Sequence, residues 1–466
     1  MEDVEADVVV IGTGPAGQKA AIQCAKLNKR VVIIEKGLDP GGNCLYSGTI
    51  PSKSLREAII DLTRFHERHF LVDTTDFEKV TINDLYQRLN RTIEEERLMI
   101  HRQFKKNNIR LIQGTARFET SKKVVVVDDS YRLSYQVSAD KFIIATGSVP
   151  RNPIHVPFDN EVILDSTRLL GIDKVPDTMI VLGGGIIGSE YASFFAALGT
   201  EVTVFDKRDH LLPLLDSEIG IHLQTALTDI GMKFVGGKKP TEIKRVGDRA
   251  KVTFEDGDSM EADTLLFCLG RHANVEGLNI ESAGLNVNEE GYLDVNELFQ
   301  TRGQPHIYAV GDVIGAPALA STSMEQGRLA ARHACGVKTH RFPTFYPIGI
   351  YTIPEISSCG YTEDELKELG FRYEVGRAYY YEIARSHIVG TNRGLFKILF
   401  HAETLEILGI HIIGRAATEV IHIGQVAVTF NAKIDYFIDH IFNYPTYAEG
   451  YRVAALNGIN KIKHRI

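Results

Sequence analysis

A glycine-rich pattern near the start of the chain constrains its fold more than any other feature. Residues 6–37 read ADVVVIGTGPAGQKAAIQCAKLNKRVVIIEKG. An apolar run ends at Ile11, a G-x-G-x-x-G pattern and an amphipathic stretch follow, and a second apolar run ends at Glu35. This order predicts a buried strand, a helix and a second strand, which together form the βαβ unit of a dinucleotide-binding fold.

The residues of this unit also suit a bound phosphate. Gly12, Gly14 and Gly17 allow the backbone to approach a pyrophosphate at the helix N-terminus, where free N–H groups and the helix dipole favour anions. Glu35 follows the last glycine by 18 residues and can accept hydrogen bonds from a ribose. The alternative is a glycine-rich turn that serves packing alone, but the preceding strand and the following acid favour a dinucleotide site.

The same pattern occurs a second time. Residues 178–212 read TMIVLGGGIIGSEYASFFAALGTEVTVFDKRDHLL. Gly183, Gly185 and Gly188 occupy the three glycine positions, and Asp206 closes the second predicted strand. Two such units about 170 residues apart predict an α/β fold with two Rossmann-like domains, which suggests one flavin nucleotide and one nicotinamide nucleotide.

Composition and charge narrow the class of protein. The 466 residues are enough for about two to four domains, and a net charge of −8 argues against a nucleic-acid-binding protein. The five cysteines are dispersed without a C-x-x-C pair, so we expect no structural metal site, no disulfide framework and a reducing compartment. Neither a secretory signal nor a membrane span is evident, which predicts a cytoplasmic protein.

Other segments connect and extend the two units. FIIATGSVPRNP (142–153) predicts a strand that enters an Ala-Thr-Gly turn and a linker, and FCLGRHANVEGL (267–278) predicts the return to the first domain. In TRGQPHIYAVGDVIG (301–315), a predicted strand ends at Gly311 and Asp312, whose carboxylate suits a flavin ribityl hydroxyl. Residues 54–106 predict helices, and from about Phe345 strands and helices mix in an α+β domain.

Five motifs, in order along the whole chain, resemble those of the flavoprotein disulfide reductases with two dinucleotide-binding domains, such as lipoamide dehydrogenase and glutathione reductase. They are GTGPAG, GGNCLYSGTIPSK, GGGIIGSE, YAVGD and NYPTYAE. The resemblance implies FAD held by the first unit and residues 301–312, NAD(P) held by the second unit, and a C-terminal interface domain that forms a homodimer or a larger oligomer.

The resemblance also implies domain boundaries and further contacts. The FAD-binding domain would comprise residues 1–150 and 273–344, the NAD(P)-binding domain 151–272 and the interface domain 345–466. Besides the glycines and acids named above, the candidate nucleotide contacts are Lys36, Gly42, Cys44, Thr49, Lys53, Ala145, Thr146, Gly147, Arg208, Gly270 and Arg271.

Two of the family's catalytic elements are altered in this chain. The family carries G-G-x-C-x-x-x-G-C-I-P-S-K, whose two cysteines exchange electrons with the flavin; here Cys44 matches the first and Thr49 replaces the second. A threonine hydroxyl cannot form a disulfide. In the family's proton-shuttling His-Pro-Thr-x-x-Glu, Tyr444 stands at the histidine position before Glu449, and a tyrosine suits proton transfer at pH 7 poorly.

The remaining motif residues point to hydride transfer without thiols. Lys53 and Glu190 match the family's ion pair beside flavin N5 and the nicotinamide, and are the candidate catalytic residues. A single cysteine, the threonine and Tyr-Pro-Thr are similar to a subgroup of the family, the soluble pyridine nucleotide transhydrogenases. This implies Si-specific transfer from NADPH to flavin and from flavin to NAD⁺, in a ping-pong cycle. The alternative is an NAD(P)H-dependent reductase of quinone, dye, metal or oxygen acceptors.

The residues that end the second βαβ unit indicate which nicotinamide nucleotide the site binds. An acid at this position accepts a hydrogen bond from the ribose 2′-OH of NAD, whereas arginines bind the 2′-phosphate of NADP. The chain has Asp206-Lys207-Arg208, an acid followed by two cations. This mixture favours a site that accepts both nucleotides, with Arg208 as the phosphate partner. An NAD site with a charged turn is the alternative.

Overall fold

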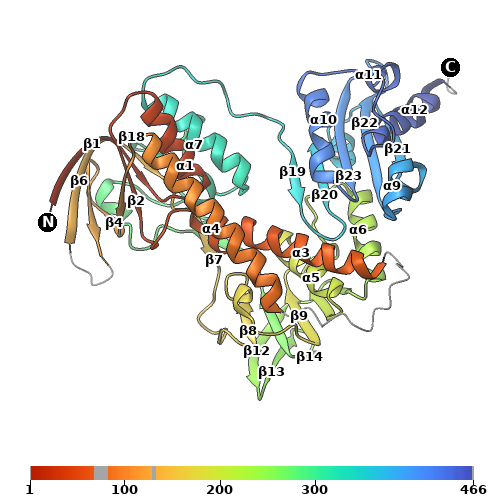
Figure 1. Ribbon diagram of the computed structural model, residues 1–466, viewed down its shortest axis with the longest axis horizontal. Helices are drawn as coiled ribbons and strands as arrows, with labels where there is room; N and C mark the ends of the chain where they lie inside the picture. The colour runs from red at the N-terminus through yellow and green to blue at the C-terminus, as the bar shows by residue number, and fades with distance from the viewer. Residues whose placement is uncertain (1, 68–81, 129–132, 464–466) are drawn as a thin grey trace. The chain divides into compact units, whose positions relative to one another are not determined.

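The computed structural model describes residues 2–67, 82–128 and 133–463 (Figure 1). The chain divides into two compact units. The first comprises Met1–Leu55, Asn83–Asn152 and Gly270–Pro343, and the second comprises Arg56–Ile82, Pro153–Leu269 and Thr344–Ile466. Each unit therefore joins segments that are far apart in the sequence.

An eight-stranded sheet forms the centre of the first unit. Strands β18, β6, β1, β2 and β3 lie side by side in this order and run parallel. The apolar run from Val8 to Ile11 in β1 is buried, as expected for a central parallel strand that is covered on both faces. The parallel strands are β1 (Glu2–Ile11), β2 (Val31–Glu35), β3 (Arg110–Gln113), β6 (Leu133–Ile144) and β18 (Gln304–Ala309).

Antiparallel strands and helices complete the first unit. Helix α1 (Pro15–Lys26) follows β1 directly, as the glycine pattern predicts, and packs on α7 (Ala320–Ala334). Short strands pair antiparallel with the sheet or with one another: β4 (Thr115–Thr120), β5 (Lys123–Val127), β17 (Gln300–Thr301), and β7 (Ser148–Pro150) with β16 (Arg271–Ala273).

The helical prediction for residues 54–106 is confirmed where the structure describes them. Helix α2 (Gly42–Tyr46) is followed by α3 (Thr49–Glu67) and α4 (Ile82–Lys106). Residues 68–81 of the predicted helical segment lie outside the described residues.

The second unit contains the second copy of the glycine pattern. It lies between β9 (Thr178–Leu182) and α5 (Ile186–Ala197), in a five-stranded parallel sheet of order β11-β10-β9-β15-β8. The other parallel strands are β8 (Ile163–Asp165), β10 (Glu201–Phe205), β11 (Lys233–Val235) and β15 (Thr264–Phe267). A separate antiparallel sheet contains β12 (Pro240–Val246), β13 (Arg249–Phe254) and β14 (Ser259–Ala262), and α6 (Ser217–Asp229) follows β10.

The C-terminal part of the second unit mixes an antiparallel sheet with helices. The sheet has the order β19-β20-β23-β22-β21, with α10 packed on β20 and β23 and α12 packed on β21 and β22. The predicted α/β class with a C-terminal α+β part is therefore confirmed. The strands are β19 (Ile348–Ile350), β20 (Ile356–Gly360), β21 (Tyr373–Tyr379), β22 (Leu395–His401) and β23 (Ile407–Ile413), and the helices are α8 (Glu363–Glu368), α9 (Ala384–Val389), α10 (Ala417–Thr429), α11 (Asp435–Asp439) and α12 (Glu449–Lys463).

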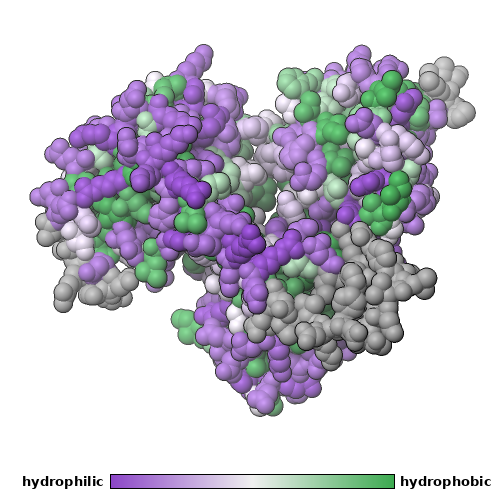
Figure 2. All heavy atoms as spheres, viewed as in Figure 1, coloured by the Kyte–Doolittle hydropathy of each residue, from purple (hydrophilic) through white to green (hydrophobic). Residues whose placement is uncertain are grey.

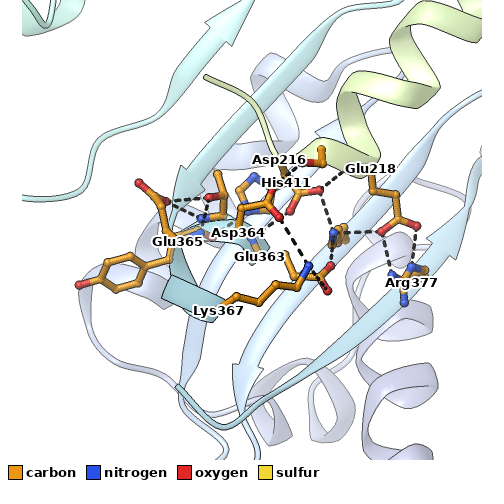
Figure 3. A network of polar contacts seen from close by, with 12 residues as sticks. Asp216, Glu218, Glu363, Asp364, Glu365, Lys367, Arg377 and His411 are labelled. Atoms are coloured by element: carbon orange, nitrogen blue, oxygen red, sulfur yellow. Dashed lines mark hydrogen bonds and ion pairs between the residues drawn. The ribbon is translucent and has the colours of Figure 1, made fainter. Parts of the chain in front are cut away.

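A buried ionic network joins α6 to this C-terminal sheet within the second unit (Figure 3). The Nζ atom of Lys397 in β22 lies 2.8 Å from Asp216 Oδ1, 3.0 Å from Glu218 Oε2 and 2.6 Å from Glu363 Oε2. The side chains of Lys397 and Asp216 are only 1% and 0% exposed. Arg377 also pairs with Glu218, at 2.7 Å between Nε and Oε1. One buried ammonium group thus contacts carboxylates from two parts of the chain.

None of the helices in the described part of the chain combines the length and apolar character that crossing a membrane requires.

Candidate active site

The first glycine loop is closely packed at two positions and open at the third. A Cβ atom added to Gly12 would lie 2.4 Å from the Ala145 carbonyl oxygen, and one added to Gly17 would lie 1.9 Å from the Gly12 carbonyl oxygen. Around a Cβ at Gly14, by contrast, the described residues place no atom within 4 Å. Gly14 caps α1, so this open backbone lies at a helix N-terminus, where an anion is favoured.

Glu35 holds this loop from the end of β2. Its carboxylate accepts a hydrogen bond from the Thr13 N–H at 3.0 Å, another from the Thr13 hydroxyl, and one from the Gly37 N–H at 2.9 Å. The Thr13 hydroxyl oxygen in turn accepts from the Gly41 N–H at 2.9 Å. The acid after the second strand therefore positions the phosphate loop, and its contact with a ribose stays a prediction. The neighbouring Lys36 is exposed.

Segments from four parts of the first unit meet at Ser148. Its hydroxyl donates to Asp312 Oδ2 at 2.8 Å, and Arg271 Nε donates to the same hydroxyl at 2.8 Å. Asn43 Nδ2 donates to the Ser148 carbonyl oxygen at 2.6 Å. The structure thus brings the predicted residues Asp312 and Arg271 together through Ser148, and Asn43 binds the Ser148 backbone; neither Ser148 nor Asn43 was predicted. Both Ser148 and Asn43 directly follow predicted residues, which was the only sequence signal for them.

Other predicted residues of the first unit lie at the first glycine loop and at the turns near Ser148. A Cβ atom added to Gly42 would lie 2.9 Å from Gly14 Cα, so the start of α2 packs on the first glycine loop. The Gly311 N–H donates to the Gln326 side-chain oxygen at 2.7 Å. The Thr146 hydroxyl is buried, and no described residue supplies it with a hydrogen-bond partner. Gly147 and Gly270 both have positive φ angles, at the turns that enter β7 and β16.

Cys44 and Thr49 lie on successive helices, in α2 and at the start of α3. Burial raises the pKa of the Cys44 thiol, and it outweighs the hydrogen bond with Thr49 and the charge of Lys53, which act in the opposite direction. The thiol is therefore protonated at neutral pH. Lys53 Nζ donates to the Ser52 hydroxyl at 3.3 Å.

Replacing Cys44 with serine is expected to leave hydride transfer between nucleotides within about twofold of wild type. A protonated thiol is a weak nucleophile, and a serine preserves its size and its hydrogen bond with Thr49. Anaerobic turnover and flavin absorbance would be measured on the same preparation. Loss of turnover with flavin still bound would show that the thiol takes part in the reaction.

The second glycine loop repeats the geometry of the first. A Cβ atom added to Gly183 would lie 2.7 Å from the Cys268 carbonyl oxygen, and one added to Gly188 would lie 1.9 Å from the Gly183 carbonyl oxygen. Gly185 caps α5 with φ −79° and ψ −173°, and a Cβ there would meet no described atom within 4 Å. The middle glycine again leaves open backbone at a helix N-terminus.

Asp206 follows β10, at the position that the sequence assigns to the ribose. Its carboxylate accepts a hydrogen bond from the Gly184 N–H at 2.7 Å and from the Arg208 N–H at 2.9 Å. The Arg208 guanidinium lies on the same carboxylate, with Nε 2.9 Å from Oδ1 and Nη2 2.7 Å from Oδ2. Burial raises the pKa of Asp206, but these hydrogen bonds outweigh it and lower the pKa below the usual value.

Glu190 is buried in α5, where its Oε1 accepts a hydrogen bond from the Tyr351 N–H at 2.8 Å. One turn later, the Ser193 hydroxyl accepts from the Ile353 N–H at 3.1 Å. Tyr351 therefore holds the Glu190 carboxylate and Ile353 contacts the same helix one turn later; sequence reasoning anticipated neither contact. Lys53 belongs to the first unit and Glu190 to the second, and their pairing stays a prediction.

Near the C-terminus, Tyr444 is 71% exposed and Glu449 begins α12. Burial raises the pKa of Glu449, whose Oε2 has no hydrogen-bond partner among the described residues.

Comparisons with known proteins cover nearly the whole chain. Residues 6–327 match the family described as pyridine nucleotide-disulphide oxidoreductase, and residues 346–455 match its dimerisation domain. A soluble pyridine nucleotide transhydrogenase from Mycobacterium tuberculosis (strain ATCC 25177 / H37Ra) is 45% identical, over 98% of this chain and 98% of that protein. One from Photorhabdus laumondii subsp. laumondii is 40% identical, over 99% of this chain and 100% of that protein. The crystal structure of LpdA from Mycobacterium tuberculosis has a TM-score of 0.89 and 25% identity, over 97% of this chain and 99% of that one.

Proposed function

Since this chain belongs to the pyridine nucleotide-disulphide oxidoreductase family, we propose that it is an FAD-dependent oxidoreductase that transfers hydride from NADPH to NAD⁺. The names of the relatives at 40–45% identity support this reading. The observation that carries the proposal is Thr49, which stands at the family's second cysteine position, at the start of the helix that follows Cys44. A site without a second thiol has no route for electrons through a disulfide.

The first unit fits FAD. The open backbone at Gly14 can receive a pyrophosphate, the buried Thr146 hydroxyl lacks a described partner, and Asp312 can accept a hydrogen bond from a ribityl hydroxyl. When bound, FAD would supply the hydride acceptor and donor that a ping-pong exchange between two nicotinamide nucleotides needs. The residues that would hold it lie in 1–150 and 273–344.

The second unit supplies the nicotinamide nucleotide site, in residues 151–272. The open backbone at Gly185 can bind the pyrophosphate, and Asp206 with Arg208 can contact the adenosine ribose. Glu190 would orient the nicotinamide end, because its carboxylate is held by the Tyr351 N–H. Lys53 would contribute a positive charge at the catalytic centre, where developing negative charge is stabilised.

We propose that residues 345–466 form the contact of a homodimer. The match to a dimerisation domain supports this assignment. Large apolar side chains between residues 426 and 444 are also exposed, including Phe430 at 78% and Ile441 at 93%. Hydrophobic residues, drawn in green in Figure 2, reach the surface in the region where Figure 1 labels the C-terminal sheet and helices. A surface of this kind is typical of a protein–protein contact.

Mixing the purified protein with NADPH and NAD⁺ under anaerobic conditions tests the function. We expect NADH to form without added dithiol, and the pro-S hydrogen of the NADPH nicotinamide to be the one transferred, as Si-specificity requires. Lipoamide and glutathione disulfide should not be reduced.

The same experiment distinguishes a transhydrogenase from the alternative, a reductase of other acceptors. If NADPH reduces the bound FAD but NAD⁺ does not reoxidise it, while a quinone, a dye, a metal ion or oxygen does, the protein is a reductase of those acceptors. The transhydrogenase proposal would then be wrong.

A further inference from the structure

The carboxylate of Asp206 is saturated with hydrogen bonds. Oδ1 accepts from the Arg208 N–H and Nε, and Oδ2 accepts from the Gly184 N–H and from Arg208 Nη2. A carboxylate offers about four lone-pair sites, and all four are used here. The side chain is also 3% exposed. In this state Asp206 has no acceptor left for a ribose hydroxyl.

The backbone donors and the Arg208 side chain behave differently if a ribose approaches. The Gly184 N–H belongs to the glycine loop, and the turn at Arg208 is backed by Gly236, where an added Cβ would lie 2.9 Å from the Arg208 carbonyl oxygen. The backbone is therefore held in place. The Arg208 side chain, in contrast, is 43% exposed, so it can leave the carboxylate without moving the fold.

The guanidinium also has hydrogen-bond donors that do not face Asp206 while it stays on this carboxylate. Nε and Nη2 contact the carboxylate, which leaves the N–H groups of Nη1 directed away from it. In this position Arg208 offsets the negative charge of Asp206 and can still donate to a phosphate. Without the arginine, a buried carboxylate would repel a 2′-phosphate.

We propose that Arg208 is a masking side chain that gives the site its dual nucleotide specificity. It stays on Asp206 when a nucleotide with a 2′-phosphate binds, masking the carboxylate and donating to the phosphate. It leaves Asp206 when a nucleotide with a free 2′-OH binds, so that the carboxylate accepts from the hydroxyl. This inference rests on the proposed function, because it assigns the adenosine ribose to Asp206.

Calorimetric titration of the oxidised holoenzyme with NAD⁺ and with NADP⁺ tests the proposal without any hydride transfer. For Arg208→Ala we expect NADP⁺ to bind about 10- to 100-fold more weakly, since a charged hydrogen bond is lost and Asp206 is unmasked. NAD⁺ should bind more tightly, by about two- to fivefold, because no ion pair has to be broken. Lys207→Ala removes a neighbouring exposed cation and should change both affinities by the same small factor.

A second substitution tests the masking itself. In the Arg208→Ala background, Asp206→Asn should recover part of the lost NADP⁺ affinity, because the repelling charge is gone, and should weaken NAD⁺ binding. Equal weakening of both nucleotides by Arg208→Ala, weaker NAD⁺ binding in that variant, or no recovery in the double variant would overturn the proposal. If neither nucleotide binds the wild-type protein, both proposals are overturned. If the affinities shift as expected but the anaerobic assay yields no NADH, only the proposed function is wrong.

Discussion

Replacing Lys397 with methionine is expected to lower the free energy of unfolding of the second unit by about 3–5 kcal/mol. The substitution keeps the apolar stem but removes the only charge that contacts Asp216, Glu218 and Glu363 together among the described residues. Asp216 is fully buried, so its carboxylate would lose a neutralising partner without gaining access to water. Differential scanning calorimetry of wild type and variant measures the change.

Lys367→Met is the matched control for this prediction. Lys367 Nζ lies 3.4 Å from Glu363 Oε1, in the same network, but the lysine side chain is 56% exposed. An exposed pair of this kind contributes at most about 1 kcal/mol. Similar losses for the two variants would show that burial does not decide the strength of the Lys397 contacts.

The same network predicts a dependence on pH. Burial raises the pKa of Glu363, but the hydrogen bond and charge of Lys397 outweigh it and hold the pKa at about 2, against a usual value of 4.5. A depressed carboxyl pKa stabilises the fold above the unfolded value, and this stabilisation is lost as the pH falls from about 4.5 towards 2. The charged and titratable groups around it are Asp216, Glu218, Asp364, Lys367, Tyr373, Arg377, Lys397 and His411.

In Lys397→Met the favourable partner is absent, so the pKa of Glu363 rises. Protonation of Glu363 at low pH then no longer lowers the free energy of unfolding. The difference in stability between wild type and variant should therefore narrow as the pH falls through this range. A difference that stays constant from pH 6 to pH 3 would contradict the assignment of the lowered pKa to Lys397.

Gly185→Val is expected to lower kcat/KM for both NADPH and NADH by about 100-fold or more. The backbone angles of Gly185 are extended and suit valine, and the described residues leave the space around its Cβ open. The variant should therefore fold. Its side chain would fill the space over the N-terminus of α5, where the pyrophosphate is expected to bind.

Flavin content separates this effect from misfolding. The first glycine loop lies in the other unit, so Gly185→Val should keep its FAD and still be reduced by dithionite, but not by NADPH. Gly171→Val, which also lies in the second unit with open space around its Cβ, should behave as wild type. Normal reduction of Gly185→Val by NADPH would place the nucleotide elsewhere.

Many elements of the fold and of the candidate site could be predicted from local sequence patterns. The two glycine loops, their flanking strands and the helices after them were predicted because each depends on residues within about 35 positions. Thr49 and Tyr444 were visible as departures from a family pattern. The mixture of strands and helices after Phe345 was also expected from the sequence.

Contacts between distant segments were decided only by the tertiary structure. Ser148 joins Asp312 from 164 positions away, and Lys397 meets Asp216 across 181 positions. A lysine in an apolar strand carries no sequence signal of the carboxylates that the fold brings to it. Even the short-range pair of Asp206 and Arg208 needed the structure, because a sequence shows which charges are present but not which of them already neutralise one another.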